Sequence, residues 1–248
     1  MGTISGQRAL VTGASAGIGA AVVRALAAEG AEVHALARRA DRLNALAAAT
    51  GAVPHATDMR DLSALERVVA ASRPAILVNN AGLGAGIAGL ATASAAEIEE
   101  TIATNVAALL QITRLAWPHL TAARGHIVNL GSVAGLYPIN SAVYGGSKGA
   151  VRRISQNLRI ELRGTGVRVT EICPGRVSTE FYDASVKDAA MREKLKTTGI
   201  SELTAAEVAD AILYALTAPR HVNISTIEIQ PVEQTYGGAF FDPLVWEE

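Results

Sequence analysis

Tyr144 and Lys148 are the residues whose types and spacing most clearly suggest acid–base chemistry. They lie four positions apart in a segment that we expect to be helical, and this spacing places both side chains on one helix face. A tyrosine has an ordinary pKa of about 10, so it is a poor acid or base at neutral pH. A neighbouring ammonium group favours the phenolate and lowers that pKa. Because such pairs are common by chance, the meaning of this one depends on the residues around it.

Short runs of β-branched residues alternate with longer stretches rich in Ala and Leu. Parallel strands need crossover connections, so this alternation predicts a parallel sheet with helices on both faces. The predicted fold is an α/β, three-layer, doubly wound, seven-stranded Rossmann fold that forms a single domain over residues 1–248. Strands are predicted at Arg8–Thr12, Glu32–Ala37, Val53–Ala56, Ala75–Asn79, His126–Leu130, Val167–Cys173 and Asn223–Gln230, and helices at Gly17–Glu29, Asp41–Ala49, Leu62–Ser72, Ala95–His119, Val143–Leu162 and Thr204–Thr217.

Two segments do not follow the alternation. Residues 178–200 have mixed polarity, and we expect them to form a mobile lid over the substrate. Residues 231–248 concentrate aromatic side chains, among them Tyr236 and Trp246, in a chain that is otherwise poor in them. A tail of this kind is more often an interface or packing arm than free coil, so we expect an arm that lies between subunits.

A glycine-rich turn follows the first predicted strand. Gly13, Gly17 and Gly19 permit a tight turn and let a pyrophosphate approach the backbone. The helix that follows directs its N-terminal amides and positive dipole end toward the phosphates. Between a strand and a helix, at the start of a doubly wound pattern, such a turn indicates a dinucleotide site. Ser15 and Ile18 of the same turn are assigned to this site as well.

The end of the second strand predicts NADP(H) rather than NAD. An acidic residue there binds the ribose 2′-hydroxyl, whereas an arginine accommodates the 2′-phosphate. Here the strand exit carries Arg38 and Arg39, with no acidic residue before Asp41. The alternative is a solvated charge pair at the start of a helix. After the third strand, Asp58 is placed to accept a hydrogen bond from the adenine amino group, and Met59 beside it is assigned to cofactor binding.

Taken together, these pieces resemble the short-chain dehydrogenase/reductase family along nearly the whole chain. The G-x-x-x-G-x-G spacing is this family's own version, and the other motifs come in order and at the right separations. The resemblance implies a nicotinamide cofactor and oxidation of an alcohol or reduction of a carbonyl. The matching motifs are Thr12–Gly19, Asp58, Asn79-Asn80-Ala81-Gly82, Asn105, Ser132, Tyr144-x-x-x-Lys148 and Pro174-Gly175-x-Val177-x-Thr179.

The resemblance also implies a role for each matching residue. Ser132 would hydrogen-bond the substrate carbonyl oxygen, and Tyr144 would donate the proton in reduction or remove it in oxidation. Lys148 would hold the nicotinamide ribose and lower the Tyr144 pKa, and Asn105 would position a water molecule in a proton relay. The other matches would bind the cofactor, with Asn80, Ala81 and Gly82 on the adenosine side and Pro174, Gly175, Val177 and Thr179 at the nicotinamide amide.

One branch of the family resembles this chain further. Ala218–Val232 and Asn157–Leu162 are similar to the branch that contains NADP-dependent serine and 3-hydroxy acid dehydrogenases. Members of this branch oxidise small β-hydroxy acids, reduce the corresponding aldehydes or ketones, or act on sulfonate analogues and broader carbonyls. The resemblance therefore favours a small hydroxy or oxo compound, with a β-hydroxy acid or a similar anion as the leading substrate class.

An anionic substrate, whether a carboxylate or a sulfonate, needs a cation near the nicotinamide. Arg176, inside the last motif, is the nearest candidate in sequence, and the lysines and arginines of residues 178–200 are others. Each of them has the alternative of being a solvated surface charge. If the neutral side chains Val133, Tyr137 and Phe181 dominate the pocket, the protein is instead a broad-specificity ketone or aldehyde reductase.

Composition disfavours several other classes of protein. The net charge of -1 and the lack of a basic stripe argue against nucleic-acid binding. No apolar run approaches the roughly 18 residues of a membrane span, and residues 1–7 do not resemble a signal peptide. The five histidines are not clustered at ligand spacing, which disfavours a metal site. Cys173, the single cysteine, is expected to be a buried core thiol, and a cytoplasmic location is expected.

The family is commonly homotetrameric or homodimeric, with long helices that pair across two-fold axes. The resemblance therefore implies a homotetramer or homodimer that takes a small-molecule substrate. A different class of function is a non-catalytic, NADP-sensing scaffold that has kept the fold. The set of Ser132, Tyr144 and Lys148 argues against that class, because a binding protein has no use for the phenol.

Overall fold

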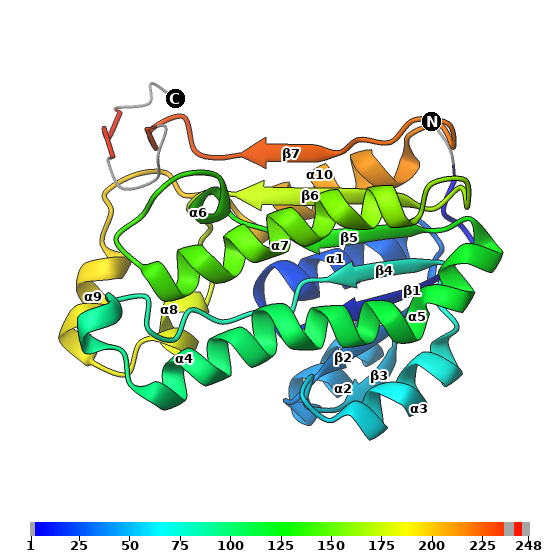
Figure 1. Cartoon of the computed structure of the whole chain (residues 1–248), viewed down its shortest axis with the longest axis horizontal. Helices are drawn as coiled ribbons and strands as arrows, with labels where there is room; N and C mark the ends of the chain where they lie inside the picture. Colours follow the sequence, from blue (N-terminus) through cyan, green and yellow to red (C-terminus); the bar gives the residue numbers. More distant parts are fainter. Residues whose placement is uncertain (1–2, 236–240, 245–248) are drawn as a thin grey trace.

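A parallel sheet forms the centre of the molecule (Figure 1), as the computed structural model shows for residues 3–235 and 241–244. Its strands within these residues are β1 (Arg8–Thr12), β2 (Glu32–Ala37), β3 (Val53–Ala56), β4 (Ile76–Asn79), β5 (His126–Leu130), β6 (Arg168–Pro174) and β7 (Thr226–Ile229). All neighbouring strands run parallel, in the order β3-β2-β1-β4-β5-β6-β7. In this order the chain starts near the middle of the sheet and winds outward in both directions. The predicted fold class is confirmed.

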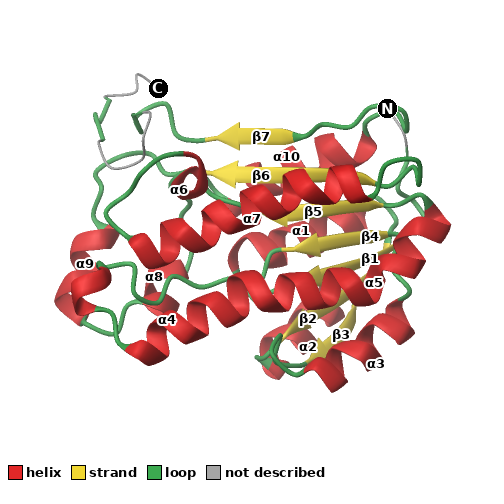
Figure 2. Ribbon diagram, in the orientation of Figure 1, coloured by secondary structure: helices red, strands yellow, loops and turns green. Residues whose placement is uncertain are grey.

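Helices cover both faces of the sheet (Figure 2) and bury one apolar cluster on each side. Within β1, Ala9 and Val11 belong to one cluster and Leu10 to the other, because successive strand side chains point to opposite faces. One face is covered by α1 (Gly17–Ala28), α2 (Ala40–Thr50) and α10 (Ala205–Thr217), and the other by α3 (Leu62–Ser72), α5 (Leu109–Ala123) and α7 (Ala142–Glu161).

The long helix predicted at Ala95–His119 has a different internal structure. It begins as α4 (Ala95–Ile102), continues through a π-helical stretch at Ala103–Ala108, and runs on as α5 to Ala123, past Pro118. A π-helical stretch inside a long helix changes which residues face the neighbouring elements, and such stretches are frequent at functional sites. Asn105 lies within it.

The seventh strand is shorter than the predicted Asn223–Gln230. Asn223 is not part of the strand, because its side chain, and not its backbone, forms the hydrogen bonds with β6. Its Oδ1 atom accepts a hydrogen bond from the Val169 amide at 2.8 Å, and its Nδ2 atom donates to the Val169 carbonyl at 3.3 Å. Regular pairing with β6 begins only at Thr226.

The segment 178–200 contains two short helices, α8 (Phe181–Ser185) and α9 (Ala189–Lys196), which lie beyond the carboxyl ends of the strands (Figure 1). A further short helix, α6 (Val133–Leu136), follows β5 at the same edge. That this segment acts as a lid stays a prediction. Of the tail 231–248, Gln234 and Phe241 form an isolated antiparallel bridge, whereas Tyr236 and Trp246 lie outside the described residues.

No helix in residues 3–235 and 241–244 is both long enough and apolar enough to cross a membrane. Within the same residues there is no group of three or more His, Cys, Asp or Glu side chains arranged to hold a metal ion. Cys173 is buried and free.

Candidate active site

Tyr144 and Lys148 lie in the first two turns of α7, beside the carboxyl end of β5. Ser141 caps this helix by accepting a hydrogen bond from the Tyr144 amide at 3.3 Å. The Lys148 ammonium group lies 5.9 Å from the centroid of the Tyr144 ring and donates to the Leu130 carbonyl at 2.7 Å. The two side chains share one face of the helix, as their spacing predicts. The bond to Leu130 ties Lys148 to the last residue of β5.

Burial controls the protonation of this pair. It raises the pKa of Tyr144 to about 12, while a side-chain hydrogen bond with Ser132 acts in the opposite direction. Burial also lowers the pKa of Lys148 to about 8, against the opposing influence of Cys173 and Glu171. Desolvation of the buried phenolate therefore dominates the Tyr144 pKa, and the lowering of that pKa by Lys148 stays a prediction. At neutral pH the phenol keeps its proton, which is the form that donates to an oxyanion.

Ser132 connects the end of β5 to this pair. It is the N-cap of α6, and its hydroxyl accepts a hydrogen bond from the Ala134 amide at 3.1 Å. Only 8% of the residue is exposed, and the same hydroxyl takes part in the hydrogen bond with Tyr144. Two hydroxyl groups from different elements therefore meet at one point, where a substrate oxygen between them could accept two hydrogen bonds.

Asn105 holds the loop after β4 against α7. Its Oδ1 atom accepts from the Leu83 amide at 2.9 Å, and its Nδ2 atom donates to the Leu83 carbonyl at 2.8 Å and to the Ser147 hydroxyl at 3.0 Å. The side-chain amide of Asn105 therefore bonds protein groups and fixes Leu83 of the loop after β4 to Ser147 of α7. Ser147 was not predicted to take part, and no pattern in the sequence distinguishes it from other serines in helices.

The turn after β1 is shaped for close approach to the backbone. Gly13 and Gly17 have positive φ angles of 67° and 52°, which favour glycine. A Cβ atom at Gly13 would lie 2.8 Å from the Cα of Ala81, and one at Gly19 would collide with the Gly13 carbonyl. Ala16, the N-cap of α1, makes no side-chain cap, so the first amides of α1 remain available for an anion.

The loop after β4 packs directly on this turn. The Thr12 hydroxyl accepts hydrogen bonds from the amides of Asn80 and Ala81, each at 3.0 Å. The Asn80 side chain donates to the carbonyls of Thr12 at 2.9 Å and Gly13 at 3.2 Å. Gly82 continues the same wall, since a Cβ at its position would lie 3.5 Å from the Lys148 ammonium nitrogen. The predicted adenosine-side residues therefore lie directly between the glycine turn and Lys148.

Arginines gather at the end of β2, where the cofactor choice was predicted. Arg39 donates to the Ser15 hydroxyl at 3.1 Å and to the Glu180 carboxylate at 2.9 Å. Arg42 donates to the same carboxylate at 2.7 Å. Arg38 is exposed and makes no hydrogen bond or ion pair within the described part of the chain. Arg42 was not predicted to take part, although it lies one helical turn after Arg38 and Arg39.

Asp58 has a protein partner in addition to its predicted role. Its carboxylate accepts from the Arg60 side chain at 2.8 Å and from the Arg60 amide at 2.9 Å, and this bonding lowers the pKa of Asp58 to about 2. The adjacent Met59 is buried. A contact between Asp58 and adenine stays a prediction. The Asp58 carboxylate is already oriented by its hydrogen bonds with Arg60.

The motif after β6 packs on the glycine turn. Thr179 lies against the glycine turn, because a Cβ at Gly17 would be 3.2 Å from its Cγ2 atom. Pro174 ends β6, and the Gly175 amide continues the ladder by donating to the Ile229 carbonyl at 2.8 Å. Val177 forms an isolated parallel bridge with Leu203.

Arg176 does not offer a free charge to an anionic substrate. Its guanidinium forms an ion pair with Glu202 at 2.7 Å, donates to the Leu195 carbonyl at 2.9 Å and hydrogen-bonds the Tyr182 hydroxyl. The side chain is 10% exposed, and that of Glu202 is 18% exposed. This placement does not support the prediction that Arg176 binds the substrate, because its donors are used to hold segment 178–200 to the loop before α10.

The other cations of segment 178–200 are also mostly paired. Lys196 and Arg192 contact Asp183 at 2.7 and 3.6 Å, and Lys187 contacts Glu97 at 3.8 Å. Lys194 is exposed on α9. Within the described residues, the substrate side of the cleft therefore offers little unpaired positive charge from this segment.

Aromatic and apolar side chains also lie near the Tyr144 phenol. The Phe181 ring lies 5.4 Å from the Tyr144 ring, centroid to centroid, and 5.3 Å from the Tyr182 ring. Val133, which follows Ser132 in the chain, is buried. Tyr137 directs its hydroxyl to the Glu228 carboxylate of β7 at 2.9 Å. The predicted wall residues Val133 and Phe181 thus border the site, whereas the Tyr137 hydroxyl is engaged at the edge of the sheet.

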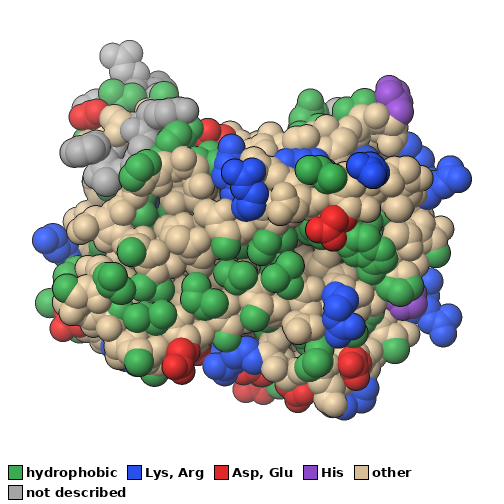
Figure 3. Space-filling model, viewed as in Figure 1, with side chains coloured by type: hydrophobic (Ala, Val, Ile, Leu, Met, Phe, Trp, Pro, Cys, Tyr) green, Lys and Arg blue, Asp and Glu red, His purple; other side chains and the backbone are tan. Residues whose placement is uncertain are grey.

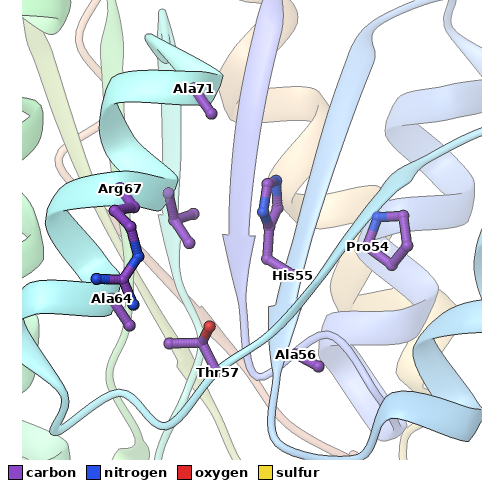
Figure 4. A pocket seen from close by; sticks show the side chains of 8 residues that line it. Pro54, His55, Ala56, Thr57, Ala64, Arg67 and Ala71 are labelled. Atoms are coloured by element: carbon purple, nitrogen blue, oxygen red, sulfur yellow. The ribbon is translucent and has the colours of Figure 1, made fainter.

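A separate hollow of about 430 Å³ lies between β3 and α3 and does not belong to this cleft (Figure 4). His55 points into it from β3, with Thr57 nearby and Arg67 on α3 (Figure 4). The Nε2 atom of His55 lies 2.9 Å from the Nδ1 atom of buried His34. Burial lowers the pKa of both rings, so the pair is neutral at neutral pH.

The family model for short chain dehydrogenases matches residues 7–190. The chain belongs to this family. It is 39% identical over 239 residues to the serine 3-dehydrogenase of Agrobacterium fabrum, covering 92% of this chain and 95% of the relative. It is 41% identical over 241 residues to the NADP-dependent 3-hydroxy acid dehydrogenase YdfG of Escherichia coli, covering 92% and 96%.

Solved structures of the family are similar in fold as well. The closed form of serine dehydrogenase complexed with NADP+ superposes with a TM-score of 0.87 at 39% identity, covering 97% of this chain and 99% of that one. The serine dehydrogenase from Escherichia coli superposes with a TM-score of 0.79 at 37% identity, covering 92% and 99%. The predicted family resemblance is confirmed over nearly the full length of the chain.

Proposed function

We propose that this protein is an NADP(H)-dependent oxidoreductase that transfers a hydride between the nicotinamide and a small hydroxy or oxo compound, with a 3-hydroxy acid such as serine as the leading substrate. The observation that carries the proposal is the meeting of Ser132, Tyr144 and Lys148 beside the glycine turn of a dinucleotide fold. The relatives named as serine and 3-hydroxy acid dehydrogenases support the substrate class.

The residues of the cleft fit a dinucleotide. The turn at Gly13 and Gly19 has no room for a Cβ, and the uncapped amides of α1 suit a pyrophosphate. Arg38 and Arg39 would meet the 2′-phosphate, for which a guanidinium offers a planar fork of donors. Thr179, packed on Gly17, would hold the nicotinamide side. When bound, the nicotinamide supplies or accepts the hydride.

The protein's own side chains handle the proton. In reduction, the hydroxyls of Ser132 and Tyr144 would hydrogen-bond the carbonyl oxygen of the substrate, and the buried phenol would give its proton to that oxygen as negative charge develops. Because the Tyr144 pKa is raised to about 12, the phenol is fully protonated at neutral pH. Lys148 stands behind the phenol and would stabilise the phenolate that remains. Oxidation of an alcohol runs these steps in reverse.

A second candidate is a broad-specificity reductase of neutral ketones and aldehydes. It is favoured by the neutralisation of Arg176 by Glu202 and by the Phe181 ring beside Tyr144. The two candidates differ in one respect, since an acid substrate requires a cation or several backbone donors at its carboxylate and a neutral ketone does not. Their relative kcat/KM values for matched acid and neutral substrates distinguish them.

The test is an absorbance assay of NADPH consumption or formation with serine, other 3-hydroxy acids, a sulfonate analogue and neutral ketones and aldehydes, run in parallel with NADH. Tyr144→Phe should lower kcat by about 10²- to 10⁴-fold, the usual contribution of a positioned general acid, and leave NADPH affinity largely unchanged. Full turnover by this variant would exclude Tyr144 as the proton donor. A clear preference for NADH would exclude the proposed role of Arg38 and Arg39.

We further propose that the protein acts as a homotetramer or homodimer through its long helices. The exposed apolar side chains Ile102, Leu110 and Ile160 on α4, α5 and α7 support this proposal, with exposures of 43%, 43% and 62%. Light scattering coupled to size-exclusion chromatography measures the mass directly. Deleting residues 232–248 should reduce the assembly if the tail is an interface arm, and an unchanged mass would remove that role.

A further inference from the structure

A second cavity lies at the amino ends of the central strands, whereas Tyr144 lies at their carboxyl ends. It has a volume of about 380 Å³, and Ile76, His126 and Arg168, the first residues of β4, β5 and β6, line it. The ends of α5 and α10 and the segment before β1 form its other walls. Ser132 follows the far end of β5, so this cavity is separate from the candidate active site.

The lining of this cavity is basic. Arg124, Arg168 and Arg220 contribute guanidinium groups, and His126 and His221 contribute imidazoles. None of the described residues that line it is an aspartate or a glutamate. Lys and Arg side chains are also visible at the end of the molecule where the strands begin (Figure 3). A cavity with this lining attracts anions, because nothing within its walls compensates the positive charge.

Arg168 keeps its charge in the cavity without a carboxylate partner. It donates to four backbone carbonyls at the end of α10 and just beyond, those of Leu216 at 2.9 Å, Ala215 and Ala218 at 3.2 Å, and Val222 at 3.4 Å. Burial and the neighbouring Arg220 lower the pKa of Arg168. Its position is therefore held rigidly by neutral groups.

The guanidinium groups of Arg124 and Arg220 have hydrogen-bond donors that no described side chain or backbone group uses. Both are exposed, and neither makes a side-chain hydrogen bond or an ion pair within residues 3–235 and 241–244. Arg124 lies at the C-terminal end of α5, with its aliphatic stem against Gly166. Two arginines with unpaired side chains thus line the same cavity as the fixed Arg168.

His126 adds a neutral polar group to the wall. The residue is 2% exposed, its Nε2 atom lies 2.8 Å from the Thr170 hydroxyl, and its Nδ1 atom has no hydrogen-bond partner in the described structure. Burial lowers the pKa of His126 to about 3, so the ring is uncharged at neutral pH. A buried ring nitrogen without a partner is costly unless a ligand or water satisfies it.

We infer that this cavity is a binding site for a phosphate dianion, either as free phosphate or as the phosphate group of a small organic ester. Guanidinium groups bind phosphate by charge-assisted hydrogen bonds, for which Arg124 and Arg220 have free donors, while Arg168 adds a fixed positive charge to the same lining. The apolar side chains of Ile4, Ile76 and Leu216 in the same lining suit the carbon body of an ester. The inference uses no residue of the proposed active site and does not depend on the proposed function.

Isothermal titration calorimetry of the full chain tests the site. The protein is first saturated with NADP+, whose own phosphates occupy the cofactor cleft, and is then titrated with inorganic phosphate or with glycerol phosphate. One equivalent of each titrant should bind. Arg220→Glu should weaken both affinities by at least about tenfold, the scale of one lost charge-assisted contact, and leave kcat unchanged.

Arg153→Glu is the matched control, because Arg153 is exposed on α7 and outside the cavity. It makes the same change of net charge and should leave both affinities as they are. Arg124→Ala provides a second variant if Arg220→Glu does not fold. Tighter binding of the ester would assign the site to an organic phosphate, and equal binding would assign it to free phosphate. Failure of both titrants to bind, or equal weakening by Arg220→Glu and Arg153→Glu, would overturn the inference.

Discussion

The ion pair between Arg176 and Glu202 is predicted to be the strongest single polar support of segment 178–200. Both side chains are largely buried, at 10% and 18% exposure, and Glu202 also accepts a hydrogen bond from the Thr198 hydroxyl at 3.1 Å. Replacing Glu202 by glutamine removes the negative charge, keeps one acceptor oxygen and leaves the Arg176 guanidinium without its counter-charge. The remaining partners of Arg176 are the Leu195 and Lys196 carbonyls and the Tyr182 hydroxyl, which carry no charge.

Removing one partner of a fully buried ion pair costs about 3–5 kcal/mol. The residual exposure and the retained acceptor reduce this cost, and we expect Glu202→Gln to lower the unfolding free energy by about 2 kcal/mol. For a domain of this size that corresponds to a fall in Tm of about 4–8 °C. Thermal unfolding followed by circular dichroism, at fixed protein and NADP+ concentrations, measures the change.

Asp183→Asn supplies the control within the same segment. Asp183 pairs with Lys196 at 2.7 Å, but its side chain is 45% exposed, so its loss should cost less than about 1 kcal/mol. If Glu202→Gln is no more destabilising than Asp183→Asn, burial does not strengthen the Arg176 pair and the reasoning fails. Glu202→Gln also frees the Arg176 charge, so it should raise kcat/KM for an acid substrate relative to a neutral one if segment 178–200 stays ordered.

Three further perturbations test other parts of the structure. The pKa of His126 is about 3 in the folded state, against an ordinary value of 6.5. The unfolded chain therefore binds a proton that the folded protein does not, and the unfolding free energy should fall as the pH drops below about 6.5 toward 3. His126→Gln should flatten this pH dependence of the unfolding free energy, measured by urea denaturation, and an unchanged slope would show that burial of His126 is not its cause. Gly19→Ala should abolish NADP+ binding measured by calorimetry because its Cβ meets the Gly13 carbonyl, whereas Gly146→Ala, which has open space around it, should bind normally. Arg39→Ala should raise KM for NADPH by about tenfold and leave KM for NADH unchanged; equal effects on both cofactors would indicate a structural role through Glu180.

Much of the fold was predictable because its signals are local. Strands β1, β2, β3 and β5 have the predicted bounds, since each is a short, largely β-branched or apolar run bounded by turn residues. The π-helical stretch at Ala103–Ala108 was not predicted, because helical periodicity does not distinguish one extra residue in a turn. The start of β7 was misplaced because Asn223 binds the Val169 backbone with its side chain, a contact between segments far apart in sequence.

Some features of the candidate site also follow from the local sequence, whereas others depend on the fold. The spacing of Tyr144 and Lys148 determines that they share a helix face, and the glycines of the first turn determine that the backbone can approach a phosphate. The charge state of the phenol depends on how deeply the surrounding elements bury it, and here desolvation raises its pKa. Likewise, whether Arg176 faces a substrate or a carboxylate depends on Glu202, which lies 26 residues away in the chain.

The sequence by itself therefore determined the order of the elements, the glycine turn and the shared helix face of Tyr144 and Lys148, because these follow from periodicity and from backbone conformations that only certain residues adopt. Only the tertiary structure decided the pKa of Tyr144, the partner of Arg176 and the basic cavity formed by Arg124, Arg168 and Arg220. Burial and charge pairing depend on residues that the fold brings together from distant parts of the chain, and no local pattern records which residues those are.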